Sequence, residues 1–114
     1  MDQPPYEMDW QRREIVLPAL IEHCRFREWP LWAAHVRSNH VHVVVAAEVV
    51  PERVMNALKA YASRRLNESS IDGLNRKRWA RHGSTRWLRD QESIAAAIRY
   101  VVDGQGEPMS VFVA

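Results

Sequence analysis

The sequence lacks several features that would assign it to particular classes of protein. It has one cysteine, Cys24, so no internal disulfide can form and the chain suits a reducing compartment. No apolar run approaches the roughly 20 residues that a membrane-spanning helix needs, and the first residues do not resemble a signal peptide. These absences argue against a disulfide-stabilised secreted domain and a membrane protein, and we expect a soluble intracellular protein.

The length and composition are those of one globular domain. The chain has 114 residues, of which 46% are hydrophobic and 26% are charged, so it can form a core. We therefore expect a single domain covering residues 1–114.

The charge is small in total but uneven along the chain. The net charge is +2, yet residues 53–89 hold ten basic side chains and two acidic ones, a local excess of +8. An excess of this size favours a polyanion as partner, although a solvated helix face also accumulates charge. The candidate nucleic-acid contacts are Arg64, Arg65, Arg76, Lys77, Arg78, Arg81 and Arg86.

Hydrophobic periodicity and turn residues predict an α+β fold with an antiparallel sheet. The expected helices cover residues 9–28, 51–67 and 90–103, and the expected strands cover residues 31–36, 40–47, 84–88 and 111–113. Asp9 and Asp90 are suitable helix caps, and Pro18 predicts a kink or a break in the first helix. The first two strands, joined by a short polar turn, predict a β-hairpin.

Two histidines occupy alternate positions on the second expected strand. Because residues i and i+2 of a strand point to the same face, His40 and His42 lie side by side, with Val41 and Val43 on the other face. Two imidazoles on a rigid strand are suited to bind a metal ion. Two ordinary polar positions on a sheet surface would give the same pattern.

Tyr100 is the tyrosine best placed to react. On a helical projection it lies about 120° from the apolar face of its helix, with the small Ser93 and Ala96 beside it. Tyr61, by contrast, lies on the apolar face of its own helix. A phenol oxygen can attack a phosphodiester and form a covalent intermediate.

Four segments closely resemble the IS200-like, single-tyrosine transposases, which are nucleases of the HUH type and include the REP-associated tyrosine transposases. The segments are Asn39–Val45 (NHVHVVV), Lys59–Asn67 (KAYASRRLN), Arg81–Arg86 (RHGSTR) and Arg99–Pro108 (RYVVDGQGEP). They occur in the order found in that family, and the resemblance extends from about residue 9 to residue 112.

The resemblance implies a ferredoxin-like, RRM-like antiparallel sheet with helices on one face. It implies that His40 and His42 bind a divalent metal, Mg²⁺ or Mn²⁺, and that Tyr100 is the nucleophile. The implied reaction is the cleavage of single-stranded DNA, often beside a hairpin, through a 5′-phosphotyrosine link. The implied protein is a homodimer, cytoplasmic and associated with the nucleoid.

The chain departs from the family pattern in two places. Many relatives carry Gln or Asn one helical turn after the tyrosine as a third metal ligand, where this chain has Gly104. Gln105 is our candidate for that ligand, with Asp103 as the alternative. Relatives also begin with a strand before the first helix, and this chain starts almost directly at the helix, so we expect a central strand to be missing.

Three functional hypotheses follow from these observations. The first is a metal-dependent DNA nuclease and strand transferase. The second is a catalytically inactive, truncated or domesticated protein that binds DNA hairpins, which the two departures favour. The third is a His-x-His metalloenzyme that acts on a small substrate, against which the basic segment argues.

Overall fold

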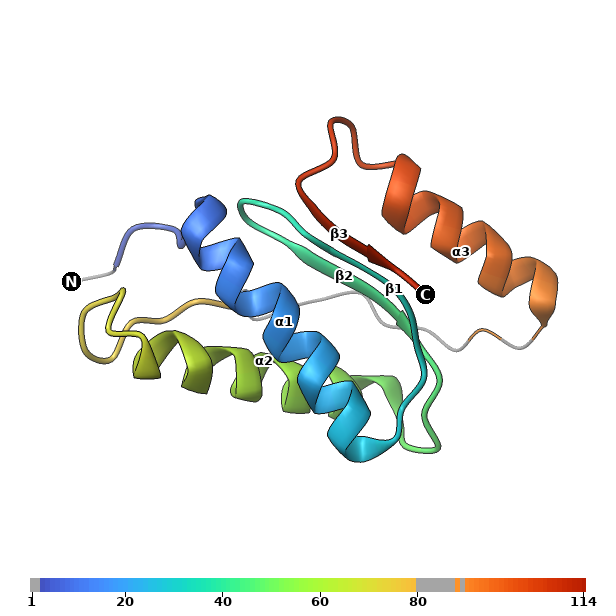
Figure 1. The fold of residues 1–114 in the computed structure, drawn as a ribbon, viewed down its shortest axis with the longest axis horizontal. Helices are drawn as coiled ribbons and strands as arrows, with labels where there is room; N and C mark the ends of the chain where they lie inside the picture. Colours follow the sequence, from blue (N-terminus) through green and yellow to red (C-terminus); the bar gives the residue numbers. More distant parts are fainter. Residues whose placement is uncertain (1–2, 80–87, 89) are drawn as a thin grey trace.

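The computed structural model describes residues 3–79, 88 and 90–114 (Figure 1). This part of the chain forms three helices and three strands. The helices are α1 (Trp10–Arg27), α2 (Pro51–Glu68) and α3 (Gln91–Asp103), and the strands are β1 (Leu31–Val36), β2 (Val41–Val45) and β3 (Ser110–Val113). The predicted α+β class is therefore confirmed. Within the described residues, no helix has the length and apolarity needed to cross a bilayer.

The three strands form one antiparallel sheet in the order β2-β1-β3. Strand β1 is central and forms the predicted hairpin with β2, while β2 and β3 lie at the edges of the described sheet. The strand expected at residues 84–88 falls outside the described residues, except for Leu88, which belongs to no strand.

Helices α1 and α2 cover one face of the sheet and form most of the core with it. Val41, Val43 and Val45 alternate along β2 and pack toward these helices, as the period of the strand requires. The buried apolar side chains of this core are Met8, Val16, Ala19, Leu20, Cys24, Val36, Val54, Leu58, Ala62 and Leu66.

Helix α3 lies on the opposite face of the sheet, which corrects the expectation that the helices share one face (Figure 1). There Val101 of α3 packs in one cluster with Ala33 and Val44. Helices can cover both faces because β1 has apolar side chains on both. Ala33 packs in the cluster with α3, whereas Val36 packs in the core with α1 and α2.

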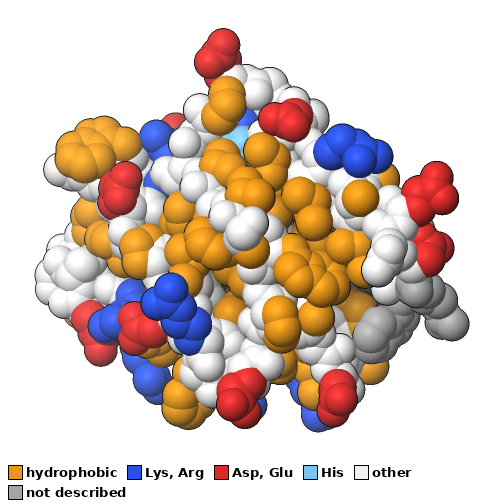
Figure 2. All heavy atoms as spheres, turned by 45° about the vertical axis from the view of Figure 1, so that its right-hand side comes forward, with side chains coloured by type: hydrophobic (Ala, Val, Ile, Leu, Met, Phe, Trp, Pro, Cys, Tyr) orange, Lys and Arg blue, Asp and Glu red, His pale blue; other side chains and the backbone are white. Residues whose placement is uncertain are grey.

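Hydrophobic side chains also gather on the surface beside this layer. Figure 2, which turns the α3 side of Figure 1 toward the viewer, shows them across the middle of that face with most charged groups around the rim. Two exposed members of the C-terminal segment are Met109 and Val113, with 38% and 53% of their surface accessible.

The helix ends follow the sequence signals. The Asp9 carboxylate accepts a hydrogen bond from the Arg12 backbone N–H at 3.0 Å, and the Asp90 carboxylate accepts one from the Ser93 N–H at 2.7 Å. Both predicted caps are therefore confirmed. Pro18 lies inside α1 without ending it, because the helix is assigned continuously from Trp10 to Arg27.

The segment before α1 is tied to the segment after α2 by one carboxylate. The side chain of Asp72 is 6% exposed and accepts hydrogen bonds from the Tyr6 hydroxyl at 2.7 Å, from Arg12 at 3.0 Å and from Arg78 at 3.1 Å. Burial acts to raise the pKa of Asp72, but these hydrogen bonds outweigh it and hold the pKa below its ordinary value of 3.8. The ionised carboxylate therefore stabilises the contact between the two segments.

We predict that Asp72→Ala lowers the free energy of unfolding by about 3 kcal/mol, because it leaves the buried Arg78 guanidinium without its carboxylate. The pKa of Asp72 is depressed in the folded state. Its contribution to the free energy of unfolding is therefore present above pH 3.8 and is lost as the pH falls through the pKa of the folded state. Urea denaturation at several pH values measures both effects. The exposed Asp103→Ala is the control, and equal losses in the two variants would contradict the prediction.

Candidate active site

The structure brings the two histidines together at the start of β2. Their rings stack with centroids 5.9 Å apart and planes inclined by 17°. His40 is exposed and its Nδ1 lies 2.8 Å from the Asn39 side-chain oxygen, which leaves Nε2 available. His42 is half-buried on the sheet face that α3 covers.

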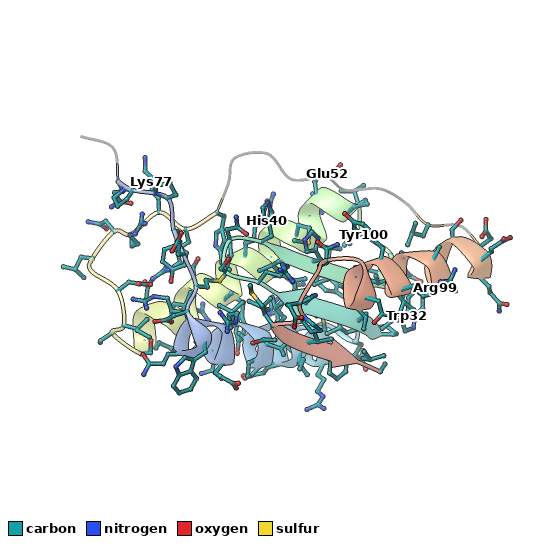
Figure 3. All side chains as sticks on the ribbon, turned by 90° about the horizontal axis from the view of Figure 1, so that it is seen from above. Trp32, His40, Glu52, Lys77, Arg99 and Tyr100 are labelled. Atoms are coloured by element: carbon teal, nitrogen blue, oxygen red, sulfur yellow. The ribbon has the colours of Figure 1, made fainter. Side chains whose placement is uncertain are left out.

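Tyr100 lies beside this pair on α3. Its ring centroid is 6.4 Å from that of His42, with the rings edge to face at 86°, and 60% of its surface is exposed. The apolar side of α3 faces the sheet through Ile98 and Val101, so Tyr100 projects from the flank of the helix. Figure 3 shows Tyr100 and His40 on the same side of the molecule.

The other two tyrosines are engaged elsewhere. Tyr61 stacks on His23 at 4.9 Å and donates a hydrogen bond to Glu22, and Tyr6 donates to Asp72. Tyr100 is thus the tyrosine that the fold places next to the histidine pair.

His42 and Tyr100 share a groove with a volume of about 1030 Å³. Apolar side chains of β2, α2 and α3 form most of its lining, including Val43, Met55 and Ala97. The polar groups of His42 and Tyr100 therefore lie in a hollow large enough for a nucleotide-sized ligand.

The surroundings of His42 favour its neutral form. Burial, and then positive charge at His40 and Arg37, lower the pKa of His42 below its ordinary value of 6.5. Neutral imidazole is the form that binds a metal ion, so burial keeps His42 in the form that can act as a ligand.

The residues after Tyr100 define where a third ligand could come from. A Cβ atom at Gly104 would lie 2.8 Å from the Tyr100 carbonyl oxygen, so this backbone has no room for Gln or Asn at that position. The next residue, Gln105, folds back instead, and its amide nitrogen donates to the same carbonyl at 3.3 Å. Asp103 is exposed at the end of α3.

Among the described residues, no group of three or more His, Cys, Asp or Glu side chains could hold a metal ion.

Several arginines predicted to contact nucleic acid are engaged within the protein. The side chain of Arg78 is 3% exposed and paired with Asp72, and Arg76 donates to Gln3 and to the Pro4 carbonyl.

Arg65, on α2, pairs with Glu22 at 2.6 Å. Arg64 and Lys77 are exposed, and Figure 3 shows Lys77 far from Tyr100. Arg81 and Arg86 lie outside the described residues.

The sequence analysis did not assign two residues that lie next to the site. His35 is fully buried opposite His42 in the register of β1 and β2, and Arg37 follows two residues later. The signal that could have found them is the spacing of His35 on β1 and Arg37 just after it, since alternate positions of an extended chain point to the same face.

The chain matches a protein family over most of its length. The family model described as "Transposase IS200 like" matches residues 8–101, a range that includes His40, His42 and Tyr100 and ends before Gln105. No curated protein and no solved structure matches the chain.

We predict that the imidazole of His42 titrates below pH 6.5 and that His40→Ala moves its pKa upward, because one of the positive charges that disfavour its protonation is removed. Histidine side-chain NMR shifts measured against pH give the values. In the control Arg27→Gln, which removes a charge beside His23, the pKa of His42 stays unchanged. A downward shift of His42 in His40→Ala would contradict the prediction.

Proposed function

The chain belongs to the family of IS200-like transposases, and on that premise we propose that it cleaves single-stranded DNA with Tyr100 as the nucleophile. The observation that carries the proposal is the position of the Tyr100 phenol. It is exposed, and its ring lies 6.4 Å from His42 and so beside the stacked histidine pair. A solvent-accessible phenol next to a candidate metal site is the arrangement that attack on a phosphate requires.

The proposed reaction exchanges one phosphodiester for another. A bond forms between the Tyr100 phenol oxygen and the phosphorus, while the bond from phosphorus to the DNA 3′ oxygen breaks. The phenol loses its proton and the 3′ oxygen gains one, so the products are a 5′-phosphotyrosine link and a free 3′-hydroxyl. Because bond energy is conserved in the link, a later 3′-hydroxyl can attack it and join the strands.

His40 and His42 would hold a divalent cation, Mg²⁺ or Mn²⁺. The stacked rings of His40 and His42 fit a pair of nitrogen ligands, and the lowered pKa of His42 favours the neutral form of that ring. When bound, such a cation polarises the scissile phosphate and stabilises its developing charge. Gln105 is the candidate third ligand: its amide nitrogen is turned to the Tyr100 carbonyl, and its side-chain oxygen is an atom type that both metals accept.

The proposed substrate is a single strand next to a DNA hairpin. Exposed cations such as Arg64 and Lys77 can contact phosphates. The internally paired Arg78 supports the fold of the basic segment rather than a DNA contact.

A second candidate function is DNA binding without cleavage. It is favoured by the absence, within the described residues, of a metal-binding group of three or more His, Cys, Asp or Glu side chains. This function predicts hairpin binding that weakens steeply with salt and forms no covalent product.

We predict that incubation with single-stranded DNA hairpins and Mn²⁺ gives a covalent protein–DNA band on a denaturing gel. Tyr100→Phe should abolish the band, because the variant lacks the attacking oxygen. Tyr61→Phe is the matched control, since it removes a hydroxyl that hydrogen-bonds to Glu22 on the other side of the sheet. An equal band from Tyr100→Phe would overturn the proposal, and salt-dependent binding without any band would support the second function.

We predict that His42→Ala removes Mn²⁺ binding and that Gln105→Ala weakens it, because the cation then keeps only the two histidine nitrogens. Mn²⁺ titration followed by electron paramagnetic resonance measures free and bound metal without DNA. His23 is half-buried among Phe26, Trp29 and Tyr61, away from the histidine pair, so His23→Ala is the control and should bind normally. Normal binding by His42→Ala would contradict the metal assignment.

We also propose that the protein is a homodimer formed through its C-terminal edge strand. Strand β3 lies at the edge of the described sheet, where unpaired backbone groups can add another strand. Hydrophobic side chains gather on the neighbouring face (Figure 2), and Val113 is one of the exposed ones. An edge strand with an apolar surface is a common site of symmetric association.

Val113→Lys should give a monomer at concentrations where the unmodified chain is a dimer, because a charge is placed within the apolar contact. Sedimentation equilibrium measures the masses. Leu74→Lys is the control, since Leu74 is 95% exposed in a segment outside the sheet. A dimer that persists in Val113→Lys would contradict this interface.

A further inference from the structure

His35 is a fully buried polar side chain on the sheet face that α3 covers. None of its surface is exposed, and it lies on β1 in the same sheet face as His42, its partner in the register. Burial of a polar ring is costly unless every polar atom has a hydrogen-bond partner, so such a residue is retained for a specific contact.

Both ring nitrogens of His35 are engaged. Nδ1 donates a hydrogen bond to the Val101 carbonyl at 2.8 Å, and Nε2 accepts one from the Met109 backbone N–H at 2.9 Å. Because a carbonyl can only accept and an amide N–H can only donate, the two contacts define the ring as neutral with its proton on Nδ1. One side chain therefore joins β1 both to α3 and to the segment that leads into β3.

The contact with α3 is made one residue after the proposed nucleophile. Val101 lies in the last turn of α3, where the final four carbonyls have no donor within the helix. Gly104 N–H bonds to the carbonyl of Tyr100, and His35 satisfies that of Val101. The end of the helix that carries Tyr100 is thus fixed to the sheet by a directional bond.

Within the described residues, most apolar side chains of α3 are only partly buried. Val101 is the buried residue of α3, whereas Ile94, Ala97 and Ile98 are only partly buried. A second tie comes from Arg37, which donates to the Glu107 carbonyl at 2.9 Å and lies 3.4 Å from His35 Nε2. The position of Tyr100 along the sheet therefore depends on side chains from the end of β1.

From this geometry we infer that His35 is a positioning residue, which sets Tyr100 against His42 by anchoring the end of α3 directly across from it. The inference rests on the proposed role of Tyr100 as nucleophile. A misplacement of about 1 Å can cost about 100-fold in rate, so the loss of this anchor slows the reaction without removing any group that touches DNA.

Two conservative variants separate the two hydrogen bonds of His35. The side-chain amide of Asn lies where Nδ1 of His35 lies, so His35→Asn keeps a donor for the Val101 carbonyl. The side-chain amide of Gln lies where Nε2 lies, so His35→Gln keeps only the contact with the Met109 N–H. At saturating DNA, we expect the rate of covalent adduct formation to fall about 10- to 100-fold in His35→Gln and to stay near that of the unmodified protein in His35→Asn. The dissociation constant for DNA should be unchanged in both. Equal rates in the two variants would overturn the inference.

A measurement without DNA or metal tests the position of Tyr100 itself. The protein is labelled with 3-fluorotyrosine, and the ¹⁹F signal of Tyr100 is the one that is lost in Tyr100→Phe. This signal should shift in His42→Ala, because the rings of Tyr100 and His42 are edge to face. We expect His35→Gln to displace this signal and to remove its response to His42→Ala, and His35→Asn to preserve both.

A Tyr100 signal that stays unchanged in His35→Gln overturns the anchoring role, whether or not the unmodified protein forms an adduct. The absence of an adduct from the unmodified protein overturns the proposed function alone. Circular dichroism of each variant shows whether it is folded, and a displaced Tyr100 signal in a folded His35→Gln supports the inference.

Discussion

The register between β1 and β2 is the constraint on which the site depends. It sets His35 opposite His42, so the residue that anchors α3 and a candidate metal ligand point to the same face. A slip of one residue would turn every side chain of β2 to the other face, placing His42 in the core with α1 and α2. The valines that alternate with the histidines prevent this slip, because they would lose their burial against those helices.

The basic residues show how charge counted along the chain overstates the surface offered to DNA. Arg78 is buried against Asp72, Arg76 holds the segment before α1, and Arg65 pairs with Glu22 on α1. Their planar guanidinium groups make several directional bonds at once, which suits them to joining segments that are distant in the sequence. Arginine richness in this chain therefore reflects the fold as well as the proposed partner.

The sequence was sufficient for the three helices and three strands of the described residues and for the common side of His40 and His42, because strand alternation and helix capping are local. It did not show that α3 covers the second face of the sheet, or that His35 connects β1 to Val101, 66 residues away. Contacts across such separations leave no periodic signal. Apolar residues on both faces of β1, such as Ala33 and Val36, did carry a hint, since a strand that is largely apolar on both faces is typical of one covered on both sides.

The weak packing of α3 explains why directional bonds matter at this site. Helices α1 and α2 share a continuous core, whereas α3 buries one residue fully. An element held this way opens more easily than the core, and reactive groups are often found on such elements. Dispersion contacts between small side chains such as Ala33 and Ala97 fix the distance of α3 from the sheet, but they resist sliding along it poorly. Hydrogen bonds from His35 and Arg37 supply that resistance, since each loses its geometry with a displacement of about 1 Å.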